Sequence, residues 1–374
     1  MTQIPMIIGD DKMKRLPNKL TLSTLLSVLL IVAFLIMGFQ SAFASPSVRI
    51  PAEWEPHAAT WIQWPVHWDE QRLRPNLAAI IDALQEYEPV NILVNKNNQI
   101  KDVKNYLQNR GIPLTNLSFY VIPHNWAWMR DNGPVYAIDA SGHFIQDWEF
   151  DGWGGWGKPF GKDNKVPRKV AEELGMPCVL YDLIVERGNL EFNGVDTLIT
   201  NWAVQNLRNP DVTMAEQEQI FKDAFGVTNV VWLLHGPSDD PTGGHVDGIA
   251  RFINASTVVV NRFVDQNDPD AWVYEEAADI VEAAGFNVLR LDIPGYVTYK
   301  GATFYCDYAN WYVANDVVVM TGFNVTEWDN AAKQTVEGYF PDRDVIVVET
   351  LQLWKDGGGV HCVTNDQPDP SITL

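Results

Sequence analysis

The sequence predicts an α/β fold in which one unit of strands and a helix recurs along the chain. Short apolar strands form hairpins whose turns fall near residues 141, 194, 255 and 315, at a nearly regular spacing. Each hairpin is followed by an amphipathic helical pattern and by one more apolar strand. The chain has 374 residues, 46% of them hydrophobic, and is therefore long enough to bury a large core.

Four hairpins are predicted from pairs of short apolar runs. Ser141-Gly142 and Asn193-Gly194 provide two of the turns, because glycine and asparagine tolerate the backbone conformations of tight turns. The predicted strand pairs are residues 134–139 with 144–150, 190–192 with 197–200, 249–253 with 257–261, and 311–314 with 317–321.

A helix and a further strand complete each unit. Apolar residues at helical spacing follow every hairpin, and each helical pattern ends close to a glycine or a proline. The predicted helices are residues 166–174, 213–225, 271–284 and 327–339, with following strands such as 230–234 and 345–348.

The two ends of the chain supply a fifth unit. Residues 360–364 are expected to pair with 58–63, followed by a helix at 76–87 and a strand at 90–94. Units that repeat and are completed by both termini are typical of a closed ring. We therefore predict a five-fold pseudo-symmetric α/β propeller closed by the two termini, as a single domain of residues 45–374. The alternative is a two-layer α/β sandwich with an accidental periodicity.

Residues 1–44 have the pattern of a targeting segment. An apolar run at residues 20–39 is followed by Ala42-Phe43-Ala44, the small-x-small pattern that signal peptidase accepts. The segment predicts export to the periplasm or the medium. An uncleaved membrane anchor is the alternative, because about 20 apolar residues can span a bilayer. The basic residues that precede the run are Lys12, Lys14, Arg15 and Lys19.

Charge and cysteine content limit the class of partner. The formal net charge of −21 disfavours nucleic acid and attracts cations, although acidity also serves solubility alone. The three cysteines, Cys178, Cys306 and Cys362, can form at most one disulfide, so at least one thiol is either buried or reactive.

Cys362 is the candidate nucleophile. Three consecutive glycines precede it, at residues 357–359, and let the backbone approach a ligand closely. The alternative is a buried cysteine that only fills space. His361 is a tempting base for the thiol, but we discount it because adjacent residues of a strand face opposite sides.

Other polar residues occupy comparable positions in the repeated units. In a ring they would converge with Cys362 at one mouth. Each also has a structural explanation: an aspartate could cap a turn, a His-Asp pair could be structural, and a glutamate could pair with its neighbour Arg187. The residues are Asp131, Glu186, His245, Asp247 and Asn310.

A thiol, an imidazole and several carboxylates together suit a planar cationic substrate. Carboxylates can hold a guanidinium group while a thiolate attacks its central carbon. A metal site is not indicated, because the sequence contains no His-x-x-x-His or Cys-x-x-Cys spacing, and no cofactor is expected.

The chain resembles the agmatine deiminases and the Porphyromonas-type peptidylarginine deiminases of the guanidine-modifying (pentein) superfamily. The resemblance implies a five-fold α/β propeller and metal-free hydrolysis of a guanidinium to a ureido group and ammonia. It rests on five motifs in order: PAEWEPH at 51–57, WMRDNGP at 128–134, WGGW at 153–156, GHVD at 244–247 and GGVHCVT at 358–364.

The resemblance also implies roles for single residues. Cys362 matches the nucleophile, and His245 the general acid and base. Asp131 and Asp247 match the residues that clamp the guanidinium. Glu186 matches an acidic residue that binds substrate, although Arg187 replaces a glycine of the family pattern. Asn310 and Trp128 are expected to line the substrate site.

The substrate is left open. Agmatine, converted to N-carbamoylputrescine and ammonia in putrescine biosynthesis, is favoured by the motifs at 51–57 and 128–134. Predicted export favours peptidylarginine, converted to citrulline, with Arg187 as a partner for a C-terminal carboxylate. Free or methylated arginine is a third option. A protein of another class, an exported non-catalytic binder of cationic ligands, would use some of the 15 tryptophans instead.

Overall fold

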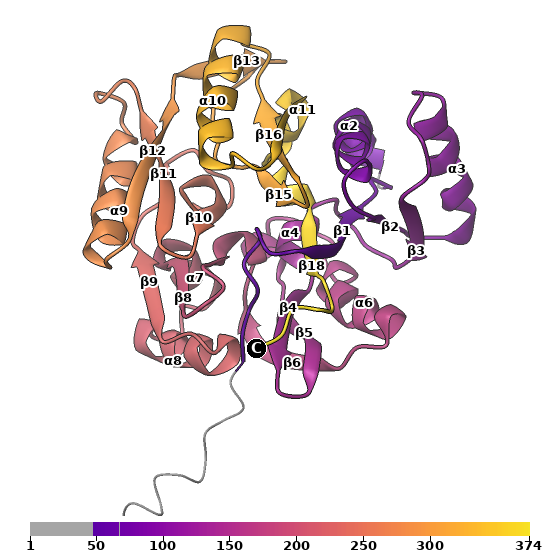
Figure 1. Ribbon diagram of the computed structural model, residues 1–374, viewed down its shortest axis with the longest axis horizontal. Coiled ribbons are helices and arrows are strands. Elements are labelled where there is room, and N and C mark those ends of the chain that lie inside the picture. The colour runs from indigo at the N-terminus through magenta and orange to yellow at the C-terminus, as the bar shows by residue number, and fades with distance from the viewer. Residues whose placement is uncertain (1–47, 67) are drawn as a thin grey trace, which may run out of the picture. The chain divides into compact units, whose positions relative to one another are not determined.

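Among residues 48–66 and 68–374, which the computed structural model describes, five sheets share one strand pattern (Figure 1). One strand pairs antiparallel with a neighbour on one side and parallel with a neighbour on the other. The three-stranded sheets are β4 (Val135–Asp139), β5 (Gly142–Glu149) and β6 (Cys178–Ile184); β7 (Glu191–Phe192), β8 (Thr197–Asn201) and β9 (Asn229–Leu233); β10 (Ala250–Asn254), β11 (Thr257–Phe263) and β12 (Asn287–Ile293); and β15 (Tyr312–Ala314), β16 (Val317–Gly322) and β17 (Asp344–Glu349).

The remaining sheet of this pattern contains strands from both ends of the described chain. β1 pairs antiparallel with β18 and parallel with β2, which in turn pairs parallel with β3. Figure 1 shows the yellow C-terminal strand beside the indigo N-terminal one. The strands are β18 (Asn365–Pro368), β1 (His57–Gln63), β2 (Val90–Val94) and β3 (Leu117–Val121).

The strand predicted at residues 360–364 is wrong. His361–Val363 form a 3-10 helix, η5, and the pairing with β1 begins only at Asn365. The Thr364 hydroxyl donates to the carbonyl oxygens of Val360 and His361, at 3.2 Å and 3.0 Å, and so closes a local turn. This turn competes with an extended backbone, as Ser and Thr side chains commonly do.

The four predicted hairpins are present, with boundaries within a few residues of those expected. A further hairpin was not predicted, and it forms a sheet of its own. Its strands are β13 (Tyr296–Tyr299) and β14 (Ala302–Tyr305), and β14 leads into the loop before β15.

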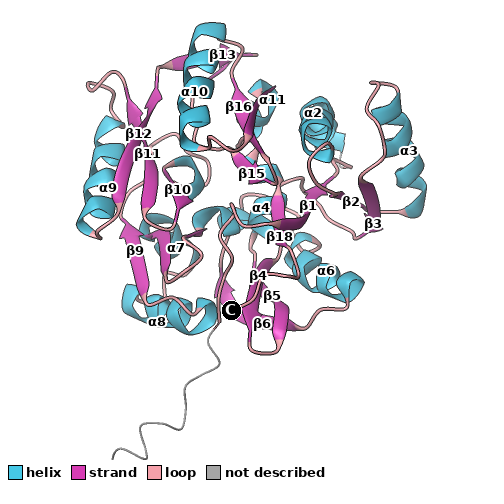
Figure 2. Ribbon diagram, viewed as in Figure 1, coloured by secondary structure: helices cyan, strands magenta, loops and turns pink. Residues whose placement is uncertain are grey.

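The predicted helices are also present. α8 begins at a capping box in which Thr213 and Glu216 bond each other's backbone, and it ends at Gly226 in the left-handed conformation. α9 buries its apolar face against β11 and β12 (Figure 2). The predicted helices appear as α2 (Arg74–Gln85), α6 (Val166–Leu174), α8 (Met214–Phe225), α9 (Ala271–Ala283) and α10 (Thr326–Tyr339).

Several helices, most of them short, were not predicted, and some of them carry the site. They are α3 (Asn97–Gln108), α4 (Met129–Asn132), α5 (Gly152–Gly155), α7 (Trp202–Arg208) and α11 (Leu351–Asp356), with the 3-10 helices η1 (Trp68–Leu73), η2 (Asp163–Lys165), η3 (Arg187–Asn189), η4 (Val246–Gly248) and η5.

Buried polar groups lie between the apolar clusters of the sheets. Glu53 accepts hydrogen bonds from the guanidinium groups of Arg130 at 3.1 Å and Arg251 at 2.9 Å. It also accepts from the backbone N–H of Val313 at 2.9 Å. Ion pairs and backbone bonds therefore tie the segment before β1 to α4, β10 and β15.

Among the described residues, contacts within the chain define one compact unit that extends to residue 374. No helix in the part of the chain that the structure describes is long and apolar enough to cross a membrane. The predicted targeting segment, 1–44, and its apolar run lie outside the described residues, so export stays a prediction. Cys178, Cys306 and Cys362 are all free thiols.

Removal of β18 is expected to abolish stable folding. A chain ending at Thr364 loses the ladder to β1 and also Asp366, whose carboxylate pairs with buried Arg130 at 2.9 Å. Loss of one partner of a buried ion pair costs about 3–5 kcal/mol. Thermal unfolding and soluble yield are the measurements. A chain lacking only residues 369–374 keeps β18 and serves as the control, and equal stability of the two truncated chains would contradict the prediction.

Candidate active site

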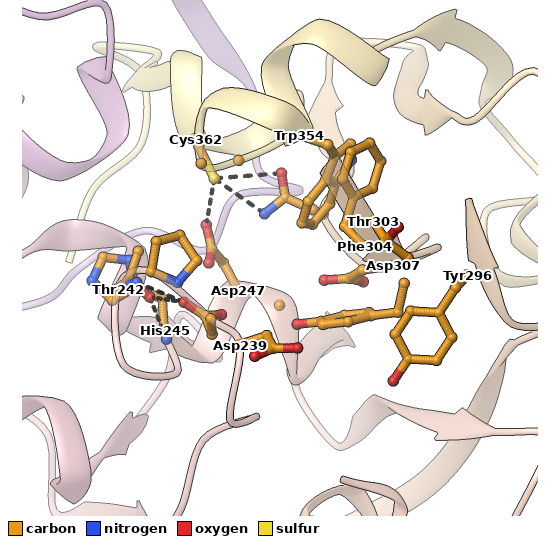
Figure 3. Close-up of a pocket in the computed structure, with 17 residues that line it drawn as sticks. Asp239, Thr242, His245, Asp247, Tyr296, Thr303, Phe304, Asp307, Trp354 and Cys362 are labelled. Carbon is orange, nitrogen blue, oxygen red and sulfur yellow. Dashed lines mark hydrogen bonds between the residues drawn. The ribbon is translucent and has the colours of Figure 1, made fainter. Parts of the chain in front are cut away.

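Cys362 lies in η5 beside a pocket, and glycines allow that position (Figure 3). A Cβ atom at Gly358 would lie 2.7 Å from the Cys362 sulfur, and one at Gly359 would lie 2.5 Å from the side-chain oxygen of Asn310. Gly357 has φ of 125°, which other residues rarely adopt. The run of glycines therefore lets the backbone turn tightly around the thiol.

The thiol of Cys362 is almost buried, with 8% of the residue exposed. The amide nitrogen of Asn310 lies 3.3 Å from the sulfur, and a carboxylate oxygen of Asp247 lies 3.8 Å from it. Burial raises the pKa of the Cys362 thiol well above its ordinary value, and the negative charges of Asp247 and Asp131 raise it further. The group is therefore a neutral thiol at neutral pH.

His245 lies directly before η4 and contacts two carboxylates. Its Nε2 is 2.6 Å from an oxygen of Glu186, and its Nδ1 is 3.5 Å from an oxygen of Asp131. Burial alone would lower the pKa of His245, but the charges of Asp131, Glu186 and Asp247 raise it to about 9. His245 is therefore an imidazolium at neutral pH and can donate a proton.

Asp247 is held by His361, a residue that sequence reasoning discounted. His361 Nδ1 lies 2.7 Å from Asp247, and Nε2 lies 2.7 Å from Glu53. Burial would raise the pKa of Asp247, but the hydrogen bond and charge of His361 lower it below the usual range. The argument from strand alternation was wrong, since His361 is in a 3-10 helix, but both ring nitrogens are engaged away from Cys362.

Asp131 lies in α4 and receives two hydrogen bonds. The indole N–H of Trp153 donates to it at 2.8 Å, and the backbone N–H of Gly188 donates at 3.3 Å. Burial is the main reason why the pKa of Asp131 rises to about 6, and the charges of Glu186 and Asp247 add to the shift. Trp153 was quoted only as part of a motif and was not predicted as a site residue.

Glu186 lies behind His245 and does not line either pocket around Cys362. It forms a bidentate pair with Arg208, at 2.6 Å and 3.1 Å, so its salt-bridge partner is not the neighbouring Arg187. Burial would raise the pKa of Glu186, but the contacts with His245 and Arg208 lower it. The geometry gives Glu186 contact with His245, and its predicted contact with substrate stays a prediction.

Arg187 is turned toward a different carboxylate. Its guanidinium donates to Asp366 at 2.8 Å, and the side chain is buried. It lines neither of the two pockets that contain Cys362. The predicted carboxylate partner for a peptide substrate is thus already paired within the protein.

Two pockets meet at Cys362. The predicted residues His245, Asp247 and Asn310 line the first pocket, and Trp128 and Asp131 line the second. Neither lining contains Lys or Arg among the described residues. Other residues of the first pocket are Asp239, Asp240, Tyr296, Thr303, Phe304, Tyr305, Asp307 and Trp354.

The site therefore combines a thiol, an imidazolium and two carboxylates in an acidic pocket. Such a set can hold a cation, attack its carbon and protonate a leaving group. Within residues 48–66 and 68–374, no group of three or more His, Cys, Asp and Glu side chains is arranged to hold a metal ion.

Comparisons with known proteins agree with this chemistry. The family model of the Porphyromonas-type peptidyl-arginine deiminases matches residues 49–368. The agmatine deiminase of Pseudomonas aeruginosa is 29% identical over 363 residues, covering 86% of this chain and 96% of that protein. Putative agmatine deiminase 2 of Listeria monocytogenes is 30% identical over 362 residues, with 86% and 95% covered.

A solved structure of the agmatine deiminase of Enterococcus faecalis superposes with a TM-score of 0.79. It is 26% identical, and the match covers 87% of this chain and 96% of that one. Fold and site thus define a hydrolase that acts on the C–N bonds of guanidino groups. The chain belongs to the Porphyromonas-type peptidyl-arginine deiminase family.

Alkylation should reveal the neutral state of the Cys362 thiol. We expect iodoacetamide to react about tenfold faster for each pH unit up to about pH 9, because the reagent attacks only the thiolate. Mass spectrometry of the labelled peptides at several pH values measures the rate for each cysteine. Half-buried Cys178, whose pKa burial raises to about 11, is the internal control. A Cys362 rate that levels off below about pH 8 would contradict the raised pKa.

Proposed function

We propose that this protein hydrolyses agmatine to N-carbamoylputrescine and ammonia through a covalent intermediate on Cys362. The observation that carries the proposal is the acidic lining around that thiol, without Lys or Arg among its described residues. Such a lining suits a substrate with positive charge at both ends and disfavours a carboxylate. Relatives named agmatine deiminases, matched over most of both chains, support the same substrate.

The first step is binding of the guanidinium group. Asp131 and Asp247 line the two pockets that meet at Cys362, and both lie close enough to its thiol to raise its pKa. Two carboxylates can hold the guanidinium nitrogens and place the central carbon beside the sulfur. The positive charge of the substrate then offsets the two negative charges and favours loss of the thiol proton to solvent.

Covalent catalysis follows in two stages. The thiolate of Cys362 attacks the guanidinium carbon, and His245 gives its proton to the departing nitrogen, which leaves as ammonia. An S-alkylthiouronium remains on the sulfur. The neutral His245 then takes a proton from water, and the hydroxide adds to the carbon. The C–S bond breaks to release the thiolate, and the added oxygen loses its remaining proton to solvent, which leaves the ureido product.

Side chains outside the pockets hold His245 and Asp247 in position. Glu186, fixed by Arg208, holds His245 by its Nε2 atom and favours its charged form. His361 holds Asp247 from the side away from the pocket.

The proposal includes the predicted propeller: the five sheets of one pattern, with β18 paired to β1, support a ring closed by the two termini.

Arginine in peptides is the second candidate substrate. Trp156 favours it, because this side chain lines the second pocket and is 72% exposed, which leaves apolar surface for a chain that extends outward. The family description and the predicted export are consistent with it. The pairing of Arg187 with Asp366 speaks against recognition of a C-terminal carboxylate.

We also propose that the protein is exported, on the targeting pattern of residues 1–44. Neither substrate requires export.

Ammonia release from the purified protein tests the substrate. We expect turnover of agmatine and little or no turnover of a peptide that ends in arginine, because no cation in the described lining offsets the peptide carboxylate. Both compounds are assayed in parallel at equal concentration. Turnover of the peptide alone would reject agmatine. Binding of agmatine without any turnover would favour the non-catalytic binding protein.

Substitution of the nucleophile tests the mechanism. Cys362→Ser should lower kcat by about 10⁴-fold or more, because loss of a nucleophile removes the covalent route. The thermal unfolding temperature should change little, since serine has nearly the same size. Cys178→Ser, at a half-buried position outside the two pockets, is the matched control and should keep its activity. Near-normal activity of Cys362→Ser would refute the covalent mechanism.

A further inference from the structure

Asp307 is a buried carboxylate of the first pocket that the mechanism above does not use. It lies in the loop between β14 and β15, lines the same pocket as Cys362, and is 0% exposed. One oxygen accepts from the side-chain N–H of Asn261 at 2.7 Å and from the backbone N–H of Ala309 at 2.8 Å. The other oxygen has no hydrogen-bond partner in the part of the chain that the structure describes.

The surroundings explain why this oxygen lacks a partner within the protein. The residue next to it is Gly248, where an added Cβ atom would lie only 3.0 Å from the oxygen. Gly248 lines the same pocket, so no side chain at that position separates the oxygen from it. A buried carboxylate without a counter-charge is costly, and burial raises the pKa of Asp307 to about 8. A cation in the pocket would remove that cost.

The neighbouring lining suits an alkyl ammonium group. Figure 3 shows Asp307 on the side of Asp247 that faces Tyr296 and Phe304, whereas His245 lies on the other side in this view. Aromatic faces pack against methylene groups and attract cations. Asp239 and Asp240 add negative charge to the lining, and no Lys or Arg occurs among its described residues.

The guanidinium end of the substrate does not need Asp307. Asp131 and Asp247 already act on the thiol, as their effect on the pKa of Cys362 indicates, whereas Asp307 lies on the far side of Asp247 from His245 in Figure 3. An unsatisfied acceptor apart from the reacting end therefore points to a second cationic group on the same ligand.

We propose that Asp307 binds the terminal ammonium of the substrate and selects aminoalkyl guanidines over guanidines whose tail is neutral or carries a carboxylate. This inference rests on the proposed function and deepens it, because it assigns substrate choice to one side chain. Asp307 thus determines specificity and takes no part in bond formation.

The test compares agmatine with butylguanidine, which has the same four-carbon chain but no ammonium. For the unmodified protein we expect kcat/KM to be about 10–100-fold higher for agmatine, since a hydrogen bond between buried charged groups is worth about 1.5–3 kcal/mol. Asp307→Asn should remove most of this ratio by lowering kcat/KM for agmatine while leaving that for butylguanidine within about threefold. Asp279→Asn, at an exposed position of α9 outside the pocket, is the matched control and should keep the ratio.

The outcomes separate the two proposals. A ratio near one in the unmodified protein would overturn the role of Asp307 without any variant, and so would an equal loss for both substrates in a folded Asp307→Asn protein. If the protein turned over both guanidines with a ratio near one, the proposed deimination would still be supported. If the unmodified protein turned over neither compound, the proposed function would fail, and the inference with it.

Discussion

The carboxylate of Glu53 is the contact on which the site depends most. Its two oxygens meet the guanidinium groups of Arg130 and Arg251 and the ring of His361, and the charges of these partners lower the pKa of Glu53 despite its burial. The three partners come from α4, β10 and η5, so one residue near the start of the described chain fixes three distant segments. A buried charge with several partners must keep each of them within hydrogen-bonding distance, because a buried charge left without its partner destabilises the fold.

His361 connects Glu53 to Asp247, which lines the pocket. The ring of His361 lies between Glu53 and Asp247, at 2.7 Å from each, so the position of Asp247 is set by residues outside the pocket. On the other side of the pocket Arg208 and Glu186 fix His245 in the same way. Two chains of ion pairs therefore hold the carboxylate and the imidazolium, which keeps the reacting groups preorganised.

Sequence patterns predicted the repeated unit better than the site. Hairpins and helices depend on local turn residues and apolar spacing, and these were read correctly at residues 141, 194 and 213–225. The strand at 360–364 was wrong because the side chain of Thr364 closes a turn that apolar pattern does not reveal. The link between Glu53 and His361 spans 308 positions, so no local pattern could show it. The convergence of the polar residues could be predicted only from the recurrence of the unit, because the spacing of single residues along the chain does not indicate it.

Burial and charge explain why the proposed nucleophile, Cys362, is a neutral thiol. Burial and the carboxylates of Asp131 and Asp247 raise the pKa of Cys362, so the thiol keeps its proton and adds no third negative charge to the pocket. Burial is the main reason why the pKa of Asp131 rises to about 6, and the charges of Glu186 and Asp247 add to the shift, so further negative charge is unfavourable there. A guanidinium group changes this balance, because it stabilises both carboxylates and the thiolate together. Under the proposed mechanism, activation of the thiol is therefore coupled to the charge of the ligand, and an uncharged ligand in the same pocket would not lower the pKa of Cys362.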